Sequence, residues 1–307
     1  MSVSVSPSPG AAGLPKMVLT HPKGAWVEIH LWGGTVTAWH PSADSENVFW
    51  VDPRNSYDAS GPIRGGIPLV FPWFGPHGLD GSLPQHGFAR ITGATVESNR
   101  SHSPGNQLFG GLPTRDSVGL SLSWKFTSDQ HWPSLSARPL PSCTLGLDMD
   151  LGEDWLRVVL AVRNESDRPL DAEMLLHPYF AVGSPLTAEV VGLEGLKYAD
   201  KNDGGRVQRH GSSAVGLVPA PDHAFEAAGP GPLTLRRPPL PTLVLERLGR
   251  CQTVVWNSGP IRGQGPETAP AFACVEPGRV REGALRGLAP GFSDGVGMKL
   301  QLDPGKA

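Results

Sequence analysis

The segment Leu120-Ser-Leu-Ser-Trp-Lys-Phe126 decides the fold class, because apolar and polar residues alternate along its whole length. Successive side chains of a β-strand point to opposite faces, so this pattern predicts a strand with one buried and one wetter face. The same alternation recurs at residues 27–31, 145–151 and 296–302. No segment keeps the 3.6-residue period of an amphipathic helix over three turns. The sequence therefore predicts an all-β protein made mainly of antiparallel strands.

Further short apolar or alternating segments predict the remaining strands. They lie at residues 35–40, 48–51, 91–97, 155–163, 173–180, 243–247, 252–256 and 272–276, and residues 282–288 form at best a short turn of helix. So many strands, with no repeat period and no central linker, predict one large sandwich of packed sheets. We expect a disordered Ser- and Pro-rich arm over residues 1–16 and a single β-sandwich domain over residues 17–307, with organellar targeting by the arm as a minor alternative.

Composition excludes several classes of function. The chain has 307 residues and a net charge of -3, so no basic field is present to bind a nucleic acid. The apolar runs fall far short of the roughly 20 residues that a membrane span needs. Three cysteines without a C-x-x-C motif fit a reducing compartment better than a disulfide framework. We therefore expect a cytoplasmic protein, monomeric, with neither nucleic acid nor membrane as a partner.

Residues 62–75 are unusually rich in conformationally special residues. The stretch Pro-Ile-Arg-Gly-Gly-Ile-Pro-Leu-Val-Phe-Pro-Trp-Phe-Gly surrounds Arg64, Trp73 and Phe74 with paired glycines, which permit close backbone approach, and with prolines, which fix the path of the chain. One interpretation is a buried arginine that ties loops together. The other is a rigid cleft wall, in which aromatic faces pack on a sugar ring and the guanidinium binds hydroxyl or phosphate oxygens.

Residues 83–90, Leu-Pro-Gln-His-Gly-Phe-Ala-Arg, form a second polar stretch. His86 and Arg90 are four residues apart, so both would point the same way from an extended segment, and Gln85 adds further donors. A histidine before a glycine is also typical of an ordinary turn. The stretch is therefore a candidate for binding one polar ligand.

His177 and Glu276 are the candidates for proton transfer. His177 lies in an apolar strand segment, where by itself a histidine is more often a hydrogen-bonded core residue than a catalyst. Glu276 ends an apolar run and must be solvated, paired or functional. A histidine and a carboxylate from distant strands are the groups that general acid/base chemistry requires. The motifs of P-loop proteins, zinc proteases and dinucleotide-binding proteins do not occur.

Together these stretches resemble the aldose 1-epimerase superfamily, and within it the hexose-6-phosphate mutarotase (glucose-6-phosphate 1-epimerase) branch. The motifs R-G-G-I-P-x-x-x-P-W-F-G, H-G-F-A-R, L-H-x-Y-F, V-W-N and V-E-P-G occur in the family's order. They lie at residues 64–75, 86–90, 176–180, 255–257 and 275–278, and the resemblance runs from about residue 18 to residue 302.

The resemblance implies a large antiparallel β-sandwich of the galactose mutarotase type (a supersandwich), with a sugar cleft across one sheet and with no metal or other cofactor. It implies an isomerase that interconverts the α and β anomers of a hexose 6-phosphate, most simply glucose 6-phosphate. The implied general acid on the ring oxygen is His177, and the implied general base on the anomeric hydroxyl is Glu276. The implied substrate-binding residues are Arg64, Gln85, His86, Arg90 and Asp222.

The match at Asp222 departs from the family pattern. The residues that usually follow this aspartate are basic, aliphatic and tyrosine, whereas here they are His223, Ala224 and Phe225. Asp200 is therefore kept as the alternative substrate aspartate.

Two arginines near a sugar ring suit a dianionic phosphate, whereas a free-sugar mutarotase needs only neutral donors and carboxylates. The sequence therefore favours a sugar phosphate as the small-molecule partner. A mutarotase for unphosphorylated hexoses and a non-catalytic carbohydrate-binding sandwich stay open as alternatives.

Overall fold

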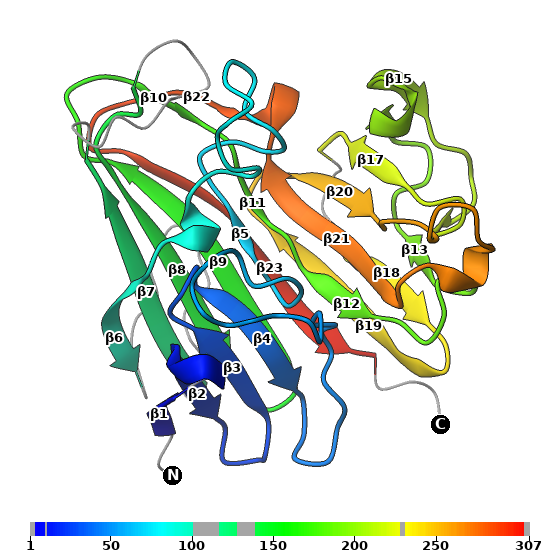
Figure 1. Cartoon of the computed structure of the whole chain (residues 1–307), viewed down its shortest axis with the longest axis horizontal. Helices are drawn as coiled ribbons and strands as arrows, with labels where there is room; N and C mark the ends of the chain where they lie inside the picture. Colours follow the sequence, from blue (N-terminus) through cyan, green and yellow to red (C-terminus); the bar gives the residue numbers. More distant parts are fainter. Residues whose placement is uncertain (1–3, 10, 101–116, 128–138, 228–230, 304–307) are drawn as a thin grey trace.

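The computed structural model describes residues 4–9, 11–100, 117–127, 139–227 and 231–303. Within them the chain forms four sheets of antiparallel strands, and its helices are short 3-10 turns (Figure 1). These turns lie at Ala11–Gly13, Ala89–Ile91, Lys201–Asp203, Pro266–Thr268 and Arg281–Gly283. The predicted all-β fold is confirmed. In the described part of the chain no helix has the length and apolar character required to cross a membrane.

The largest sheet has nine strands and forms one layer of the sandwich. From edge to edge it holds β16 (Val215–Gly216), β13 (Glu189–Val191), β18 (Leu233–Arg237), β19 (Leu240–Leu248), β23 (Ser293–Leu302), β9 (Trp155–Asn164), β8 (Cys143–Leu151), β7 (Val118–Phe126) and β6 (Thr95–Arg100). The segment whose alternation decided the fold class lies in β7, next to the edge strand β6.

An eight-stranded sheet and a four-stranded sheet form the facing layer (Figure 1). The eight-stranded sheet has the order β15 (Arg206–Arg209), β14 (Lys197–Asp200), β17 (Asp222–Phe225), β20 (Gln252–Trp256), β21 (Phe272–Arg279), β11 (Met174–Leu176) and β5 (Leu69–Val70), with β12 (Tyr179–Ala181) also paired to β21. The four-stranded sheet holds β1 (Ser4–Pro9), β2 (Pro15–Thr20), β3 (Trp26–His30) and β4 (Thr35–His40), and a separate pair joins β10 (Leu170–Ala172) to β22 (Leu285–Leu288).

The apolar core lies between these layers, where β11 and β21 pack on β23 and β2 packs on β7. Period-two alternation divides the eight-stranded sheet into two faces. Leu176 and Val255 belong to the main core, whereas their neighbours Leu175 and Val254 belong to a smaller apolar cluster on the opposite face. This second face carries the candidate site.

The predicted disordered arm over residues 1–16 needs correction in the residues that the structure describes. Ser4–Pro9 forms β1, which pairs with β2 along its whole length, and β2 begins at Pro15. Prolines such as Pro7 and Pro9 suggest disorder in the sequence, but an edge strand pairs on one side only and tolerates residues without an N–H group. Residues 1–3 and 10 lie outside the described residues, and the single domain over residues 17–307 stays a prediction.

Several predicted element boundaries were wrong. Residues 48–51 make isolated bridges rather than a strand, and the strand predicted from residue 91 begins at Thr95, after a 3-10 turn. Residues 285–288 form β22 rather than part of a helical turn, because they pair with β10. The strand predicted over residues 173–180 is divided into β11 and β12 at His177 and Pro178, where proline cannot donate a ladder hydrogen bond.

Candidate active site

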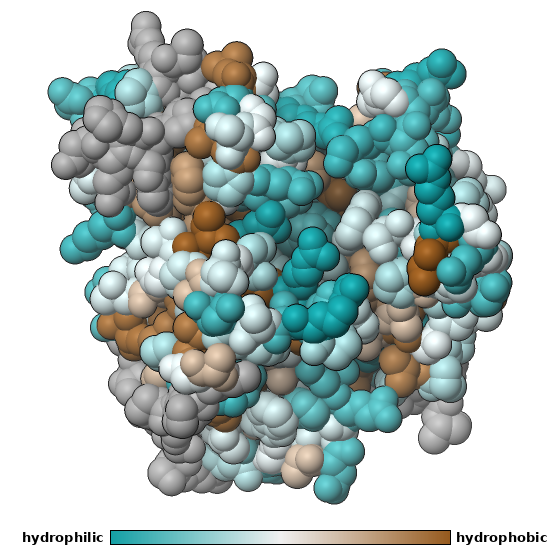
Figure 2. Space-filling model, viewed as in Figure 1, coloured by the Kyte–Doolittle hydropathy of each residue, from teal (hydrophilic) through white to brown (hydrophobic). Residues whose placement is uncertain are grey.

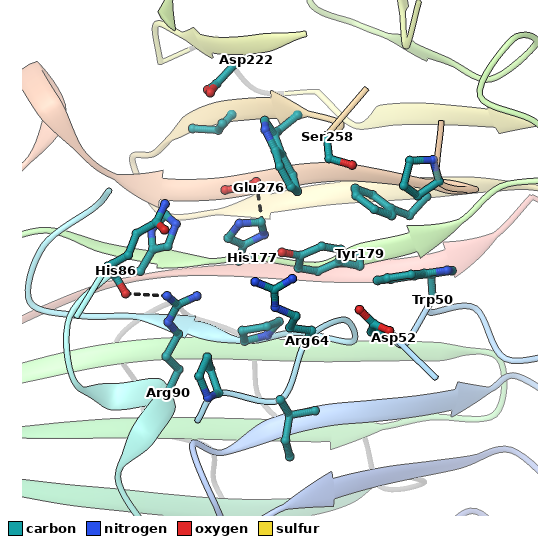
Figure 3. Close-up of a pocket in the computed structure, with 18 of the residues that line it drawn as sticks. Trp50, Asp52, Arg64, His86, Arg90, His177, Tyr179, Asp222, Ser258 and Glu276 are labelled. Carbon is teal, nitrogen blue, oxygen red and sulfur yellow. Dashed lines mark hydrogen bonds and ion pairs between the residues drawn. The ribbon is translucent and has the colours of Figure 1, made fainter. Parts of the chain in front are cut away.

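A cavity of about 470 Å³ opens on the second face of the eight-stranded sheet (Figure 3). All seven residues that the sequence predicted for the site line it: Arg64, Gln85, His86, Arg90, His177, Asp222 and Glu276. Hydrophilic side chains gather around the hollow in this face of the molecule (Figure 2). The structure therefore brings together residues that lie up to about two hundred positions apart in the chain.

Strand register explains why His177 and Glu276 meet. Leu175 pairs with Gly278 and Tyr179 pairs with Cys274, so the same antiparallel register places His177 opposite Glu276. Residues directly opposite each other point to the same face of a sheet. The Nδ1 atom of His177 lies 3.3 Å from Oε1 of Glu276.

Both members of this pair are deeply buried, with side-chain exposures of 7% for His177 and 1% for Glu276. Burial, reinforced by the positive charge of Arg90, lowers the pKa of His177 to about 3. Burial, reinforced by the negative charge of Asp222, raises the pKa of Glu276 well above its usual value. Both shifts favour the uncharged forms of the pair, a neutral imidazole beside a carboxylic acid.

The pair also has unused hydrogen-bonding capacity. In the described part of the chain neither Nδ1 of His177 nor Oε2 of Glu276 has a hydrogen-bond partner, although both atoms are buried. Buried polar atoms are normally satisfied, and exceptions are typical of functional sites. Both residues line the cavity that a polar ligand would fill (Figure 3).

His86 lies beside the pair at a backbone position that few residues adopt. Its φ is +67°, and the N–H of Gly75 donates a hydrogen bond of 3.1 Å to its Nδ1. This bond requires an unprotonated Nδ1. Burial and the nearby charges of His177 and Arg90 lower the pKa of His86 to about 2, so it stays a neutral group in the wall.

Arg64 and Arg90 form the positive wall of the cleft (Figure 3). Arg90 donates from Nη2 to the main-chain oxygen of Gln85 at 2.5 Å, but its buried Nε has no hydrogen-bond partner within the described residues. Burial, reinforced by the charge of Arg64, lowers the pKa of Arg90 to about 10. Neither guanidinium is paired with a carboxylate in the part of the chain described, so two mutually repelling cations face the cavity.

The paired glycines before this wall have the role that the sequence suggested. Gly65 and Gly66 adopt φ values of +94° and +66°, and a Cβ atom on either would collide with the main chain of Trp50 or Val36. Gly66 donates to the oxygen of Trp50 and accepts from the N–H of Tyr179, both at 2.8 Å. Close backbone contact thus fixes the segment that carries Arg64.

The two candidate substrate aspartates differ in position. Asp222 lines the cavity, whereas Asp200 is not among its lining residues. Asp200 accepts a hydrogen bond from the N–H of Asn202 and lies 3.6 Å from Nε2 of His223. Lys201, which the sequence analysis missed, lines the cavity and places its Nζ 3.2 Å from Oδ2 of Asp222. No recognisable motif surrounds Lys201 in the sequence, so only the folded structure shows that it lies at the cavity.

An aromatic wall faces the arginines, and the sequence analysis did not identify most of it. It consists of four rings with neighbouring centroids 4.9–6.0 Å apart, contributed by Trp50, Tyr179, Trp256 and Phe272. Such apolar faces suit the C–H surfaces of a sugar ring. Asp52 and Arg54, also missed, lie beside this wall and form an ion pair of 2.8 Å. The adjacent aromatic residues Phe49 and Trp50, and the tryptophan of the V-W-N motif, were the available signals.

Two residues support the site from behind. Glu173 accepts hydrogen bonds from the N–H groups of Phe74 and Arg281, so it holds the Phe74 loop against the sheet. Asn257, from the V-W-N motif, donates to the main-chain oxygens of Phe272 and Pro270 and accepts from the N–H of Gly259. Both side chains therefore hold neighbouring loops in place through hydrogen bonds to their main chain.

Comparison with known proteins identifies the family. A family model described as Aldose 1-epimerase matches residues 15–300. The chain belongs to the aldose 1-epimerase family. This membership confirms the resemblance predicted from the ordered motifs and supports aldose 1-epimerase activity, which makes the protein an epimerase of the isomerase class.

Two curated relatives connect this aldose 1-epimerase family member to the hexose-6-phosphate mutarotase branch. A protein from Cenchrus ciliaris, provisionally named glucose-6-phosphate 1-epimerase, is 28% identical over 279 residues, which cover 88% of this chain and 80% of the relative. A protein of the same provisional name from Escherichia coli (strain K12) is 28% identical over 192 residues, or 60% of this chain and 54% of the relative.

The fold of this aldose 1-epimerase family member is also that of a solved structure. A provisionally named mutarotase from Salmonella typhimurium superposes with a TM-score of 0.77 at 19% identity, covering 97% of this chain and 92% of the other. At that identity the likeness establishes the fold alone. The predicted mutarotase-type β-sandwich is confirmed.

Proposed function

We propose that this protein interconverts the α and β anomers of a hexose 6-phosphate, with glucose 6-phosphate as the first candidate. The observation that carries the proposal is the His177–Glu276 pair, buried and lining one cavity beside two arginines that have no carboxylate partner among the described residues. The proton-transfer pair supports the epimerase chemistry. The unpaired arginines support the phosphate ester.

The pair supplies the two proton transfers that ring opening needs. Transfer of its single proton from Glu276 to His177 gives a carboxylate and an imidazolium. The carboxylate then takes the proton of the anomeric hydroxyl while the imidazolium protonates the ring oxygen, and the bond between C1 and the ring oxygen breaks to give the open aldehyde. Each positioned proton transfer contributes about 10² to 10⁴ in rate.

Ring closure on the other face completes the reaction. Rotation about the C1–C2 bond presents the opposite face of the aldehyde, and the hydroxyl that formed the ring attacks it. His177 takes back the proton from that hydroxyl, and Glu276 returns a proton to the carbonyl oxygen. The enzyme ends with the same one-proton pair, so no covalent intermediate is needed.

The arginine wall favours a phosphorylated substrate. Arg64 and Arg90 repel each other, and a dianionic phosphate between them offsets this repulsion through charge-assisted hydrogen bonds. We assign the sugar hydroxyls to Gln85 and Asp222, and the apolar face of the ring to the aromatic wall. His86 packs against the ring as a neutral wall residue.

Exchange NMR of anomeric protons tests this proposal. The purified full-length chain is expected to accelerate exchange between α and β glucose 6-phosphate well above the buffer rate, and more strongly than it accelerates exchange of glucose at equal concentration. Equal acceleration of both sugars supports the alternative, a mutarotase for free hexoses. Binding of either sugar without acceleration supports a non-catalytic carbohydrate-binding sandwich.

A further inference from the structure

One cluster at the floor of the cleft contains a side chain that the epimerase reaction does not use. His177, Cys274 and Glu276 offer a ring nitrogen, a thiol sulfur and a carboxylate oxygen that lie within 4.8 Å of one another, and all three residues are buried. Cys274 does not line the cavity that His177 and Glu276 line. Sugar binding therefore gives no reason for a thiol at this position.

The ladder explains how the three side chains converge. Cys274 and Glu276 are two residues apart on β21, so they point to the same face of the sheet. Cys274 pairs with Tyr179, which places it one step along the ladder from His177. The cluster is therefore fixed by the register of two strands, and no loop movement is needed to assemble it.

We propose that this cluster binds a thiophilic divalent cation of the Zn²⁺ class, which competes with the sugar. Ligand atoms around tetrahedral Zn²⁺ lie about 3.3–3.7 Å apart, as metal–ligand lengths of about 2.0–2.3 Å require. The 3.3 Å separation between His177 Nδ1 and Glu276 Oε1 already meets this spacing. A sulfur at most 4.8 Å away needs a contraction of about 1 Å, within reach of a side-chain adjustment.

Ligand chemistry and charge both favour this class of cation. Thiolate, imidazole and carboxylate together select Zn²⁺ or Cd²⁺ over Mg²⁺ or Ca²⁺, which prefer oxygen ligands. Binding releases the protons of the Cys274 thiol and the Glu276 carboxyl. The resulting thiolate and carboxylate balance the two positive charges, so the occupied floor is electrically neutral, as a buried site requires. The buried Nδ1 of His177 and Oε2 of Glu276, which lack hydrogen-bond partners in the described chain, are electron-pair donors already in place.

Competition follows from the shared atoms. A cation held by His177 and Glu276 occupies the two groups that transfer protons, so the cation and the sugar exclude each other. The competition rests on the proposed function, but cation binding itself does not. His177 and Glu276 line the cleft, so a water molecule can complete the coordination from that side.

Cadmium titration of the full-length protein tests the site independently of catalysis. Cadmium–thiolate bonds give an ultraviolet charge-transfer absorption, which we expect to saturate at one Cd²⁺ per chain. The Cys274→Ala variant should lose this absorption and bind Zn²⁺ at least about tenfold more weakly. Cys251→Ala is the matched control, because Cys251 is also a buried free cysteine but lies outside the cluster, and it should bind as the unmodified protein does.

Two further measurements complete the test. Glucose 6-phosphate should displace Cd²⁺ and abolish the absorption, and Zn²⁺ should slow anomer exchange in a way that a chelator reverses. An unaltered absorption in Cys274→Ala, or no saturable Cd²⁺ binding by the unmodified chain, overturns the proposal. If Cys274→Ala fails to fold by its melting curve, Cys274→Val is used in its place. Cd²⁺ binding without any epimerase activity would retain the cation site and reject the proposed function.

Discussion

The two faces of strand β21 are both buried, yet they have opposite properties. Ala273 and Val275 point into the main core and belong to its apolar cluster. Cys274 and Glu276, their immediate neighbours, point to the opposite face, which carries the cleft, and place polar atoms out of contact with water. Burial alone therefore does not define a core. What distinguishes the cleft face is polar groups without partners, which a stable core avoids.

The comparison also indicates where stability is lost and where function is gained. The core face gains free energy from apolar burial. The cleft face holds a carboxylic acid and two histidines whose charged forms are disfavoured. Groups with pKa values displaced in this way are typical of catalytic sites. Substitutions on the two faces should therefore have separable effects on stability and on rate.

The largest expected effect is on catalysis, from Glu276→Gln on the cleft face. Anomer exchange should slow by about 10² to 10⁴, because the amide cannot accept the anomeric proton. The free energy of unfolding at pH 7 should not fall, since the folded protein no longer holds a buried acid whose ionisation is disfavoured. Exchange NMR and urea unfolding measure the two effects. Glu246→Gln, at an exposed position of β19, is the control and should change neither. Near-normal exchange in Glu276→Gln would remove the mechanism.

The next effect is on stability, from Leu176→Ala on the core face, next to His177. Leu176 is fully buried in the main core, so truncation should lower the free energy of unfolding by about 2–5 kcal/mol through lost contacts and a cavity. Exchange per folded molecule should change by less than about tenfold, because the side chain points away from the cleft. A rate loss as large as that of Glu276→Gln would show that the two faces are not separable.

A third effect is the pH dependence of stability that comes from the buried histidines. The unfolded His86 has a pKa near 6.5 and the folded one a pKa of about 2, so below pH 6.5 the unfolded state binds more protons. The contribution of His86 to the free energy of unfolding is fully present above pH 6.5. It declines as the pH falls toward 2, and at pH 5 it is lower by about 2 kcal/mol. Glu276, with a raised pKa, contributes in the opposite direction.

The measurement for His86 is therefore a difference between two proteins. His86→Asn keeps a hydrogen-bond acceptor and tolerates the positive φ, but it does not titrate. Between pH 7 and pH 5 the variant should lose about 2 kcal/mol less free energy of unfolding than the unmodified protein. Parallel pH profiles would mean that His86 ionises freely in the folded state.

The smallest expected effect is on KM, and it distinguishes substrate binding by the arginine wall from proton transfer by the catalytic pair. Arg90→Ala should raise KM for glucose 6-phosphate by about tenfold, through loss of a charge-assisted hydrogen bond, and should change KM for glucose less. Arg54→Ala is the matched control, because Arg54 also lines the cavity but is already paired with Asp52. Equal changes for both sugars in Arg90→Ala would place the phosphate elsewhere.

Much of the fold was predictable because alternation is a local property. Strands such as β7 and β8 follow directly from the apolar positions on one face, and the paired glycines at 65 and 66 indicated close backbone contact. The Ser- and Pro-rich start was misjudged, because pairing with β2 decides its structure and composition does not show pairing. The division of the 173–180 segment depends likewise on which neighbours bond to each residue.

The sequence by itself determined the period-two pattern, and with it an all-β sandwich, and its ordered motifs pointed to the aldose 1-epimerase family. It named His177 and Glu276 separately, but nothing local states that the two lie opposite each other, since this depends on the register of β11 and β12 against β21. Tertiary structure alone placed Lys201 beside Asp222 and Cys274 beside the catalytic pair. The reason is physical: alternation acts between neighbours in the chain, whereas register and burial act between strands about a hundred residues apart.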